Sequence, residues 1–286
     1  MIEVLTDPFS QGIGLRALVE VVILGAVCAP VGVWIVLYRQ SYAAESIAHS
    51  MLPGLVAATL IGLPLGLGAA AGLAAAALLI AACSRQRAVS ADVAIAVAVT
   101  ALFGAGSLLA LSPEVPLRLG ELLFGDPLSV SDGDLLASAA LAIALLAAML
   151  AGHRSLTVVG FDSQTAPNLG VSPAAVGTGL LVLLGATALV AVQALGNLLV
   201  VAIVVGPAAA SLRICTRLPP ALIVAAAIGV VSGVSGLYLS FYADVAAGAS
   251  IALCAVAAFG LSLPFGRSVS ADARHGGSPV DALGGV

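Results

Sequence analysis

The sequence predicts an all-α, polytopic membrane protein of about nine transmembrane helices, within a range of roughly eight to ten. Of its 286 residues, 61% are hydrophobic and only 8% are charged, whereas an average soluble domain carries roughly 25% charged residues. The apolar residues form long unbroken runs, unlike the alternating segments of a membrane β-barrel. Helices are the other way to satisfy backbone groups in lipid. A soluble enzyme, a nucleic-acid-binding protein and a disordered chain are excluded.

Nine apolar runs approach the length of about 20 residues that a helix needs to cross a bilayer. They cover residues 14–37, 43–61, 64–83, 91–111, 135–151, 174–193, 196–212, 220–240 and 245–263. The sixth and seventh runs are separated only by the short stretch from Gln193 to Asn197. We therefore expect a membrane domain over residues 13–265, an N-terminal segment over 1–12 that could lie at the interface, and a polar tail over 266–286.

The arginines indicate which side of the membrane faces the cytoplasm. The chain has no lysine, and with nine alternating spans eight of its ten arginines fall on one side, leaving Arg16 and Arg118 on the other. Basic residues gather in cytoplasmic loops. We therefore expect a multi-pass membrane protein with its C-terminus in the cytoplasm and its N-terminus outside. Arginine without lysine and heavy alanine use fit a GC-rich bacterial genome, so the expected location is a bacterial plasma membrane.

Two loops are too long to be simple turns. The outer loop 112–134 begins with two prolines that end the incoming helix, and Ser131 is positioned to cap the next one, with acidic residues in its first turn. The inner loop 152–173 contains FDSQTAPNLG, which has a polar helix start and a glycine stop at Gly170. A short helix there is equally compatible with a docking element and with a linker.

One polar stripe lies inside the second span. Glu45 and His49 are four residues apart and so share a helix face. Pro53 follows four residues later and has no N–H for the His49 carbonyl, which leaves that oxygen open to a pore. A carboxylate with an imidazole suits Zn²⁺, Mn²⁺ or Fe²⁺. A structural ion pair between helices and a proton relay are the alternatives.

The remaining polar residues are less informative. Glu20 lies one turn after Arg16 and could pair with it, and His153 is expected to be solvated in the inner loop. Gln193 and Asn197 could face a pore or satisfy the backbone at the break between two spans. The four cysteines have no CxxC spacing and are interpreted as small buried hydrophobes. Because the chain has no Walker A motif, ATP-driven work would require a partner chain.

Four motifs resemble those of one membrane family: ESIAHSMLPG at 45–54, LLFGDPLSVSDGDLL at 122–136, FDSQTAPNLGV at 161–171 and QALGNLLVVAIVVGPAAAS at 193–211. Over about residues 8–263 the chain resembles ABC-3 permeases, the membrane subunits of ATP-binding-cassette importers for zinc, manganese and iron. The family typically reads D-A-L-S-H-x-x-L-P-G in the first motif, so Glu45 replaces an aspartate here. The resemblance implies that Glu45 and His49 contact the transported metal, and the substitution leaves the metal preference open.

The resemblance also implies partners. Residues 161–171 correspond to the coupling helix that enters a groove of the ATPase, which places Phe161, Asp162, Ala166, Leu169 and Gly170 at that contact. It further implies a fold similar to that of vitamin B12 importers, a second permease copy, two ATPase chains in the cytoplasm, and an extracytoplasmic metal-binding protein outside, in a lipid bilayer and without nucleic acid. The metal is cargo, and no permanently bound cofactor is expected.

These observations predict the permease subunit of an ATP-driven metal importer, which is not itself an enzyme. A proton-coupled secondary transporter with a Glu45–His49 relay is the main alternative, and it would run without an ATPase. A non-transporting scaffold would tolerate replacement of Glu45. A cobalamin or siderophore permease would need a wide pore, in which the Glu–His pair has no evident role.

Overall fold

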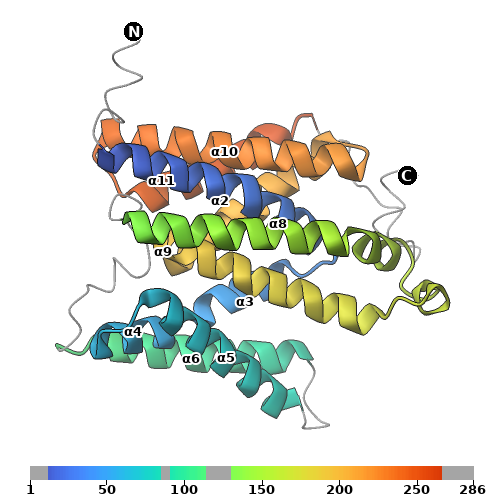
Figure 1. Ribbon diagram of the computed structural model, residues 1–286, viewed down its shortest axis with the longest axis horizontal. Coiled ribbons are helices and arrows are strands. Elements are labelled where there is room, and N and C mark those ends of the chain that lie inside the picture. The colour runs from blue at the N-terminus through green and yellow to red at the C-terminus, as the bar shows by residue number, and fades with distance from the viewer. Residues whose placement is uncertain (1–11, 85–90, 114–129, 266–286) are drawn as a thin grey trace.

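The computed structural model describes residues 12–84, 91–113 and 130–265, and all regular structure in these residues is helical (Figure 1). The helices are α2 (Gly12–Leu37), α3 (Ser41–Ser50), α4 (Leu52–Ile61), α5 (Leu65–Ser84), α6 (Ala91–Ala110), α8 (Asp132–Phe161), α9 (Pro173–Ile214), α10 (Leu218–Ala243) and α11 (Ala247–Ser262), with a 3₁₀ turn η3 (Ala166–Leu169) before α9. Three predicted parts of the chain lie outside the described residues: the N-terminal segment apart from residue 12, most of the outer loop 112–134, and the tail over 266–286.

The predicted spans coincide with these helices. Five described segments are long and apolar enough to cross a membrane, and four shorter apolar helical segments accompany them. Each of the nine predicted runs falls on one of these segments. The agreement follows from the sequence itself, since uninterrupted apolar runs in lipid can satisfy their backbone only as helices.

Helix α2 lies at the centre of the bundle and packs closely on α10 (Figure 1). A Cβ atom on Gly25 would lie 2.5 Å from the backbone of Gly229, and one on Gly233 would lie 2.2 Å from the side chain of Val21. Moving back along α2 from Gly25 to Val21 corresponds to moving forward along α10 from Gly229 to Gly233, so the two helices are antiparallel. Glycine at such crossings lets the two backbones approach closely. The resulting van der Waals contact stabilises helix pairs in lipid, where no hydrophobic driving force acts between them.

Helix α8 runs parallel to α2, as the first and fifth spans of an alternating chain must. At one end, Arg16 donates to Asp132 at 3.1 Å. At the other end, the Tyr38 hydroxyl donates to the Leu156 carbonyl at 2.7 Å. The expected pairing of Arg16 with Glu20 is therefore wrong, because Asp132 at the start of α8 is within reach of the guanidinium.

The predicted inner loop 152–173 begins too early. Helix α8 continues to Phe161, and its Ser131 cap forms the reciprocal capping box with Asp134 that the sequence suggested only in part. Nothing between residues 152 and 161 breaks the helix, and His153, expected to be solvated, packs its ring edge-on against Trp34 with centroids 5.6 Å apart. Tertiary packing thus extends the helix beyond its apolar run.

The structure gives α9 as one helical element of 42 residues, with two apolar segments in it, Pro173–Val192 and Val200–Ile214, where the sequence predicts two spans. A straight helix of that length would measure about 63 Å, twice the thickness of the bilayer core. In a straight rod, Leu180 and Val204 would be about 36 Å apart. Figure 1 shows the first half of α9 as the yellow helix beside α8.

The contacts of α9 exclude a straight rod. Leu180 and Leu156 line the same groove, and the Leu156 carbonyl is bonded to Tyr38. Val204 contacts Gly32, which is only six residues before Tyr38. Both halves of α9 therefore lie toward the same end of α2. The chain direction must reverse between Leu180 and Val204, so the two halves form two antiparallel passes, as predicted for residues 174–193 and 196–212.

Charges separate along the bundle. In the described part of the chain, four arginines lie at or near the end of α2 that carries Leu37: Arg39, Arg154, Arg213 and Arg217. Arg16 and Asp132 lie at the opposite end. The arginine-rich end therefore also carries η3 and the link from α8 to α9.

Candidate functional site

The stripe of Glu45 and His49 lies on α3, just before an interruption of the second span. Helix α3 ends at Ser50 and α4 begins at Leu52. Pro53 in the first turn of α4 has no N–H to offer to the His49 carbonyl. At the junction, the Met51 N–H donates to the Ala48 carbonyl at 3.3 Å. The proline thus ends the regular helix within two residues of the histidine.

The structure brings the two predicted ligands together. His49 Nε2 lies 3.8 Å from a carboxylate oxygen of Glu45, and the side chains are 22% and 57% exposed. The shared helix face is therefore confirmed, whereas metal contact stays a prediction. No group of three or more His, Cys, Asp or Glu side chains in the described residues is arranged to hold a metal ion. One chain offers a two-residue half-site.

Glycines enclose the junction between α3 and α4. A Cβ on Gly54 would lie 2.0 Å from the Gly68 carbonyl oxygen, and a Cβ on Gly72 would lie 2.8 Å from the Met51 carbonyl oxygen. From α6, a Cβ on Gly106 would lie 2.7 Å from the Pro53 nitrogen. Helices α5 and α6 therefore press their backbones against the interruption and fix its position.

Two further sequence predictions on pore-lining residues remain open. The side chains of Gln193 and Asn197 lie outside the described residues. Pro53 is half-buried and shapes the junction. The sequence missed Phe103, whose ring packs against His49 from α6. No local pattern could identify it, since the two residues are 54 positions apart.

The predicted coupling segment follows α8 at the arginine-rich end. Asp162 caps α8, and one of its carboxylate oxygens accepts from the backbone N–H groups of Gln164 at 2.8 Å and Thr165 at 3.2 Å. Its other oxygen accepts from the Thr165 hydroxyl. These hydrogen bonds, that of the Thr165 hydroxyl first, hold the pKa of Asp162 below its usual value. Asp162 therefore shapes the turn as a carboxylate.

The segment turns one buried residue inward and two apolar residues outward. Ala166 is fully buried at the start of η3, whereas Phe161 and Leu169 are 51% and 66% exposed. Gly170 ends the turn with φ of 75°, a left-handed conformation that glycine adopts readily. The predicted short helix and glycine stop are confirmed. The role of this segment as a docking element stays a prediction.

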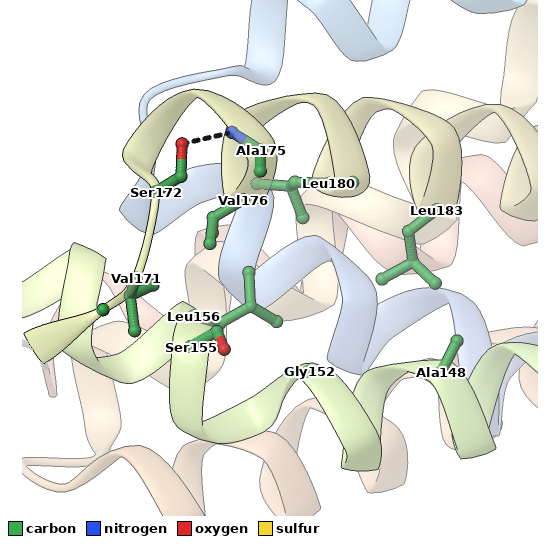
Figure 2. Close-up of a pocket in the computed structure, with 12 residues that line it drawn as sticks. Ala148, Gly152, Ser155, Leu156, Val171, Ser172, Ala175, Val176, Leu180 and Leu183 are labelled. Atoms are coloured by element: carbon green, nitrogen blue, oxygen red, sulfur yellow. Dashed lines mark hydrogen bonds between the residues drawn. The ribbon is translucent and has the colours of Figure 1, made fainter. Parts of the chain in front are cut away.

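A groove of about 550 Å³ lies behind this segment, between α8 and the first half of α9 (Figure 2). Its lining includes Gly152, Leu156, Val176 and Leu180, and the Ser172 hydroxyl at its edge accepts from the Ala175 N–H at 3.4 Å. None of the lining residues is titratable. The lining of the groove therefore offers no carboxylate, imidazole or thiolate side chain to a metal ion.

Comparisons with known proteins agree with this architecture. The model of the ABC 3 transport family matches residues 11–266. The chain is 33% identical, over 87% of its length and 86% of the relative, to the manganese transport system membrane protein MntC of Halalkalibacterium halodurans. It is 29% identical, over 88% of its length and 85% of the relative, to the chelated iron transport system membrane protein YfeC of Yersinia pestis.

A solved structure has the same fold. PsaBC from Streptococcus pneumoniae, in complex with Fab, superposes with a TM-score of 0.84 at 26% identity, covering 96% of this chain and 98% of that one. The family match spans nearly the whole membrane domain, including the α3 stripe and the coupling segment. The chain belongs to the ABC 3 transport family and is a membrane permease subunit, not an enzyme.

Proposed function

We propose that this permease carries divalent transition-metal ions, manganese or iron foremost and zinc as a third candidate, into a bacterial cell on ATP hydrolysis by a partner chain. The observation that carries the proposal is the Glu45–His49 pair, 3.8 Å apart within a span. Relatives named for manganese and iron transport support the choice of cargo. Mixed oxygen and nitrogen ligands suit all three metals.

The exposure of Glu45 supports a second permease copy. An ionisable side chain that faces lipid is expensive, yet this carboxylate is 57% exposed in the single chain. A second copy or a water-filled path must therefore cover it. In a symmetric pair, two carboxylates and two imidazoles could surround one axis and make a transient four-ligand site. Such a site releases its ion when the two halves separate, which suits alternating access.

The two ends of the bundle have different partners in this proposal. We take the arginine-rich end to face the cytoplasm, with the C-terminus on the same side. There, Phe161 and Leu169 dock on the ATPase, and Asp162 keeps the turn rigid enough to transmit its motion. The opposite end receives the ion from an extracytoplasmic metal-binding protein, partly on the outer loop.

Metal uptake by cells that contain the permease, its ATPase and its binding protein tests the proposal. Glu45→Gln keeps the approximate size of the side chain and removes its negative charge, and His49→Gln removes the imidazole nitrogen; each is expected to lower uptake at least about tenfold. Thr59→Val on α4 is the matched control, because its hydroxyl only bonds the Val56 carbonyl at 2.7 Å.

Three outcomes separate the alternatives. Normal uptake by both stripe variants would show that the stripe is not the path. Uptake that continues without ATP but stops when the proton gradient is collapsed would favour the proton-coupled transporter. Uptake that requires ATP and both stripe residues is the result expected here.

A further inference from the structure

His49 receives an aromatic contact from a different span. The ring centroids of His49 and Phe103 are 5.1 Å apart, with an interplanar angle of 63°. This edge-to-face geometry is one that aromatic pairs prefer. Phe103 lies on α6 and has no part in the Glu45–His49 stripe.

The position of Phe103 is fixed by backbone contact. Three residues further along α6, Gly106 packs on the junction between α3 and α4, where a Cβ would lie 2.7 Å from the Pro53 nitrogen and 3.0 Å from the Leu52 carbonyl carbon. Gly104, on the same helix, has nothing within 4 Å of its Cβ position. Gly106 thus sets how closely α6 approaches, and with it the placement of Phe103 on His49.

The imidazole lacks the usual means of orientation. A histidine ligand commonly donates its second ring N–H to a carboxylate, a carbonyl or water, which fixes the ring. In the described part of the chain, His49 Nδ1 is buried and has no hydrogen-bond partner. The other nitrogen, Nε2, is the one near Glu45. With no hydrogen bond on Nδ1, the orientation of the ring must come from packing.

We infer that Phe103 is a positioning residue for metal binding: its ring holds the His49 imidazole so that Nε2 stays beside the Glu45 carboxylate, and Gly106 allows the approach of α6 that puts it there. This inference rests on the proposed function. It adds to the site two residues of α6 that touch no metal themselves.

Mn²⁺ binding to the purified full-length permease, followed by the loss of the electron paramagnetic resonance signal of free Mn²⁺, tests this inference. Phe103→Ala is expected to weaken Mn²⁺ binding about tenfold, in the range of lost outer-shell support. Phe103→Tyr keeps the ring and should bind nearly as the wild type, with Phe103→Leu between them. Leu102→Ala, the neighbour on α6, is the matched control and should bind normally.

A second pair of variants covers the case in which Phe103→Ala does not give folded protein. Gly106→Ala should push α6 from the junction and weaken Mn²⁺ binding, whereas Gly104→Ala, the same change two residues away, should not. A merely structural role for Phe103 predicts that Phe103→Ala lowers thermal stability while the affinity for Mn²⁺ stays unchanged.

The outcomes distinguish this inference from the proposed function. Wild-type binding that Glu45→Gln abolishes but neither Phe103→Ala nor Gly106→Ala weakens would overturn the positioning role and leave the metal path intact. Wild-type protein that binds no Mn²⁺, or binds it as well after Glu45→Gln, would overturn the metal site, and the positioning role with it. Weakening by Phe103→Ala with rescue by Phe103→Tyr supports both.

Discussion

Replacement of Gly32 by alanine is expected to damage the permease far more than its single methyl group suggests. A Cβ at this position would lie 1.8 Å from the Val204 carbonyl oxygen and 3.0 Å from the Ala208 Cβ. The obstacle at Val204 is backbone inside a helix, so no side chain can rotate away. Helix α2 and the second half of α9 must separate instead.

The size of the effect follows from that distance. Ordinary contact begins near 3.4 Å, so the helices must move apart by about 1.6 Å if nothing else yields. Overpacking of this kind typically costs about 1–3 kcal/mol, and alanine returns about 0.5–1 kcal/mol through its better helix propensity. Because the obstacle is backbone, we take the upper end of the overpacking range and expect a net loss of about 2 kcal/mol, or a fall in melting temperature on the order of 5 °C.

Thermal unfolding of the purified permease in detergent, followed by the fraction that stays monodisperse after heating, measures this loss. Gly177→Ala is the control, because this glycine lies on α9 and has nothing within 4 Å of its Cβ position. It should melt at or slightly above the wild-type temperature. Equal melting of Gly32→Ala and Gly177→Ala would refute the contact, and with it the reversal of α9 inferred from Val204 and Gly32.

Three further changes probe polar groups of the bundle. Tyr38→Phe removes the hydroxyl that donates to the Leu156 carbonyl at 2.7 Å and should cost about 1 kcal/mol in the same melting assay; an unchanged melting temperature would contradict that bond. Glu20 is 1% exposed, and one carboxylate oxygen has no hydrogen-bond partner within the described residues. Glu20→Gln should therefore be neutral or stabilising, and a folded Glu20→Gln protein without metal uptake would instead show that transport uses the charge. Hydrogen bonds to the carboxylate lower the pKa of Asp162 in the folded chain. The turn that these hydrogen bonds stabilise is therefore fully formed above the usual pKa of the group and loosens as the pH falls through the lowered pKa. Pepsin should cleave residues 161–169 faster only at pH values below 3.8, and this pH dependence should be absent in Asp162→Asn.

Much of the membrane architecture could be predicted because it depends on local composition. Apolar runs mark the helices. Ser131 marks the start of α8, Gly170 marks the end of η3, and Pro53 marks the junction after His49. The facing of Glu45 and His49 was predictable for the same reason, since residues four apart in a helix always share a face. Each of these signals is complete within a few residues of sequence.

Errors arose where a residue finds its partner across the bundle. Arg16 binds Asp132, 116 positions away, although Glu20 lies one turn along its own helix. His153 packs on Trp34, and this contact together with the bond from Tyr38 to Leu156 accompanies the extension of α8 past its apolar run. Sequence periodicity shows which face of a helix is polar but not which helix will cover that face.

By itself, the sequence determined that the chain spans a membrane as helices, that one end is rich in arginine, and that Glu45 and His49 share a face. Only the tertiary structure decided that the second half of α9 packs on α2 at Gly32, that Gly106 admits α6 to the α3–α4 junction, and that Phe103 packs on His49. The physical reason is one of range. The helical repeat determines which residues within two turns share a face. Close packing between spans depends instead on which glycines of one helix meet the backbone of another.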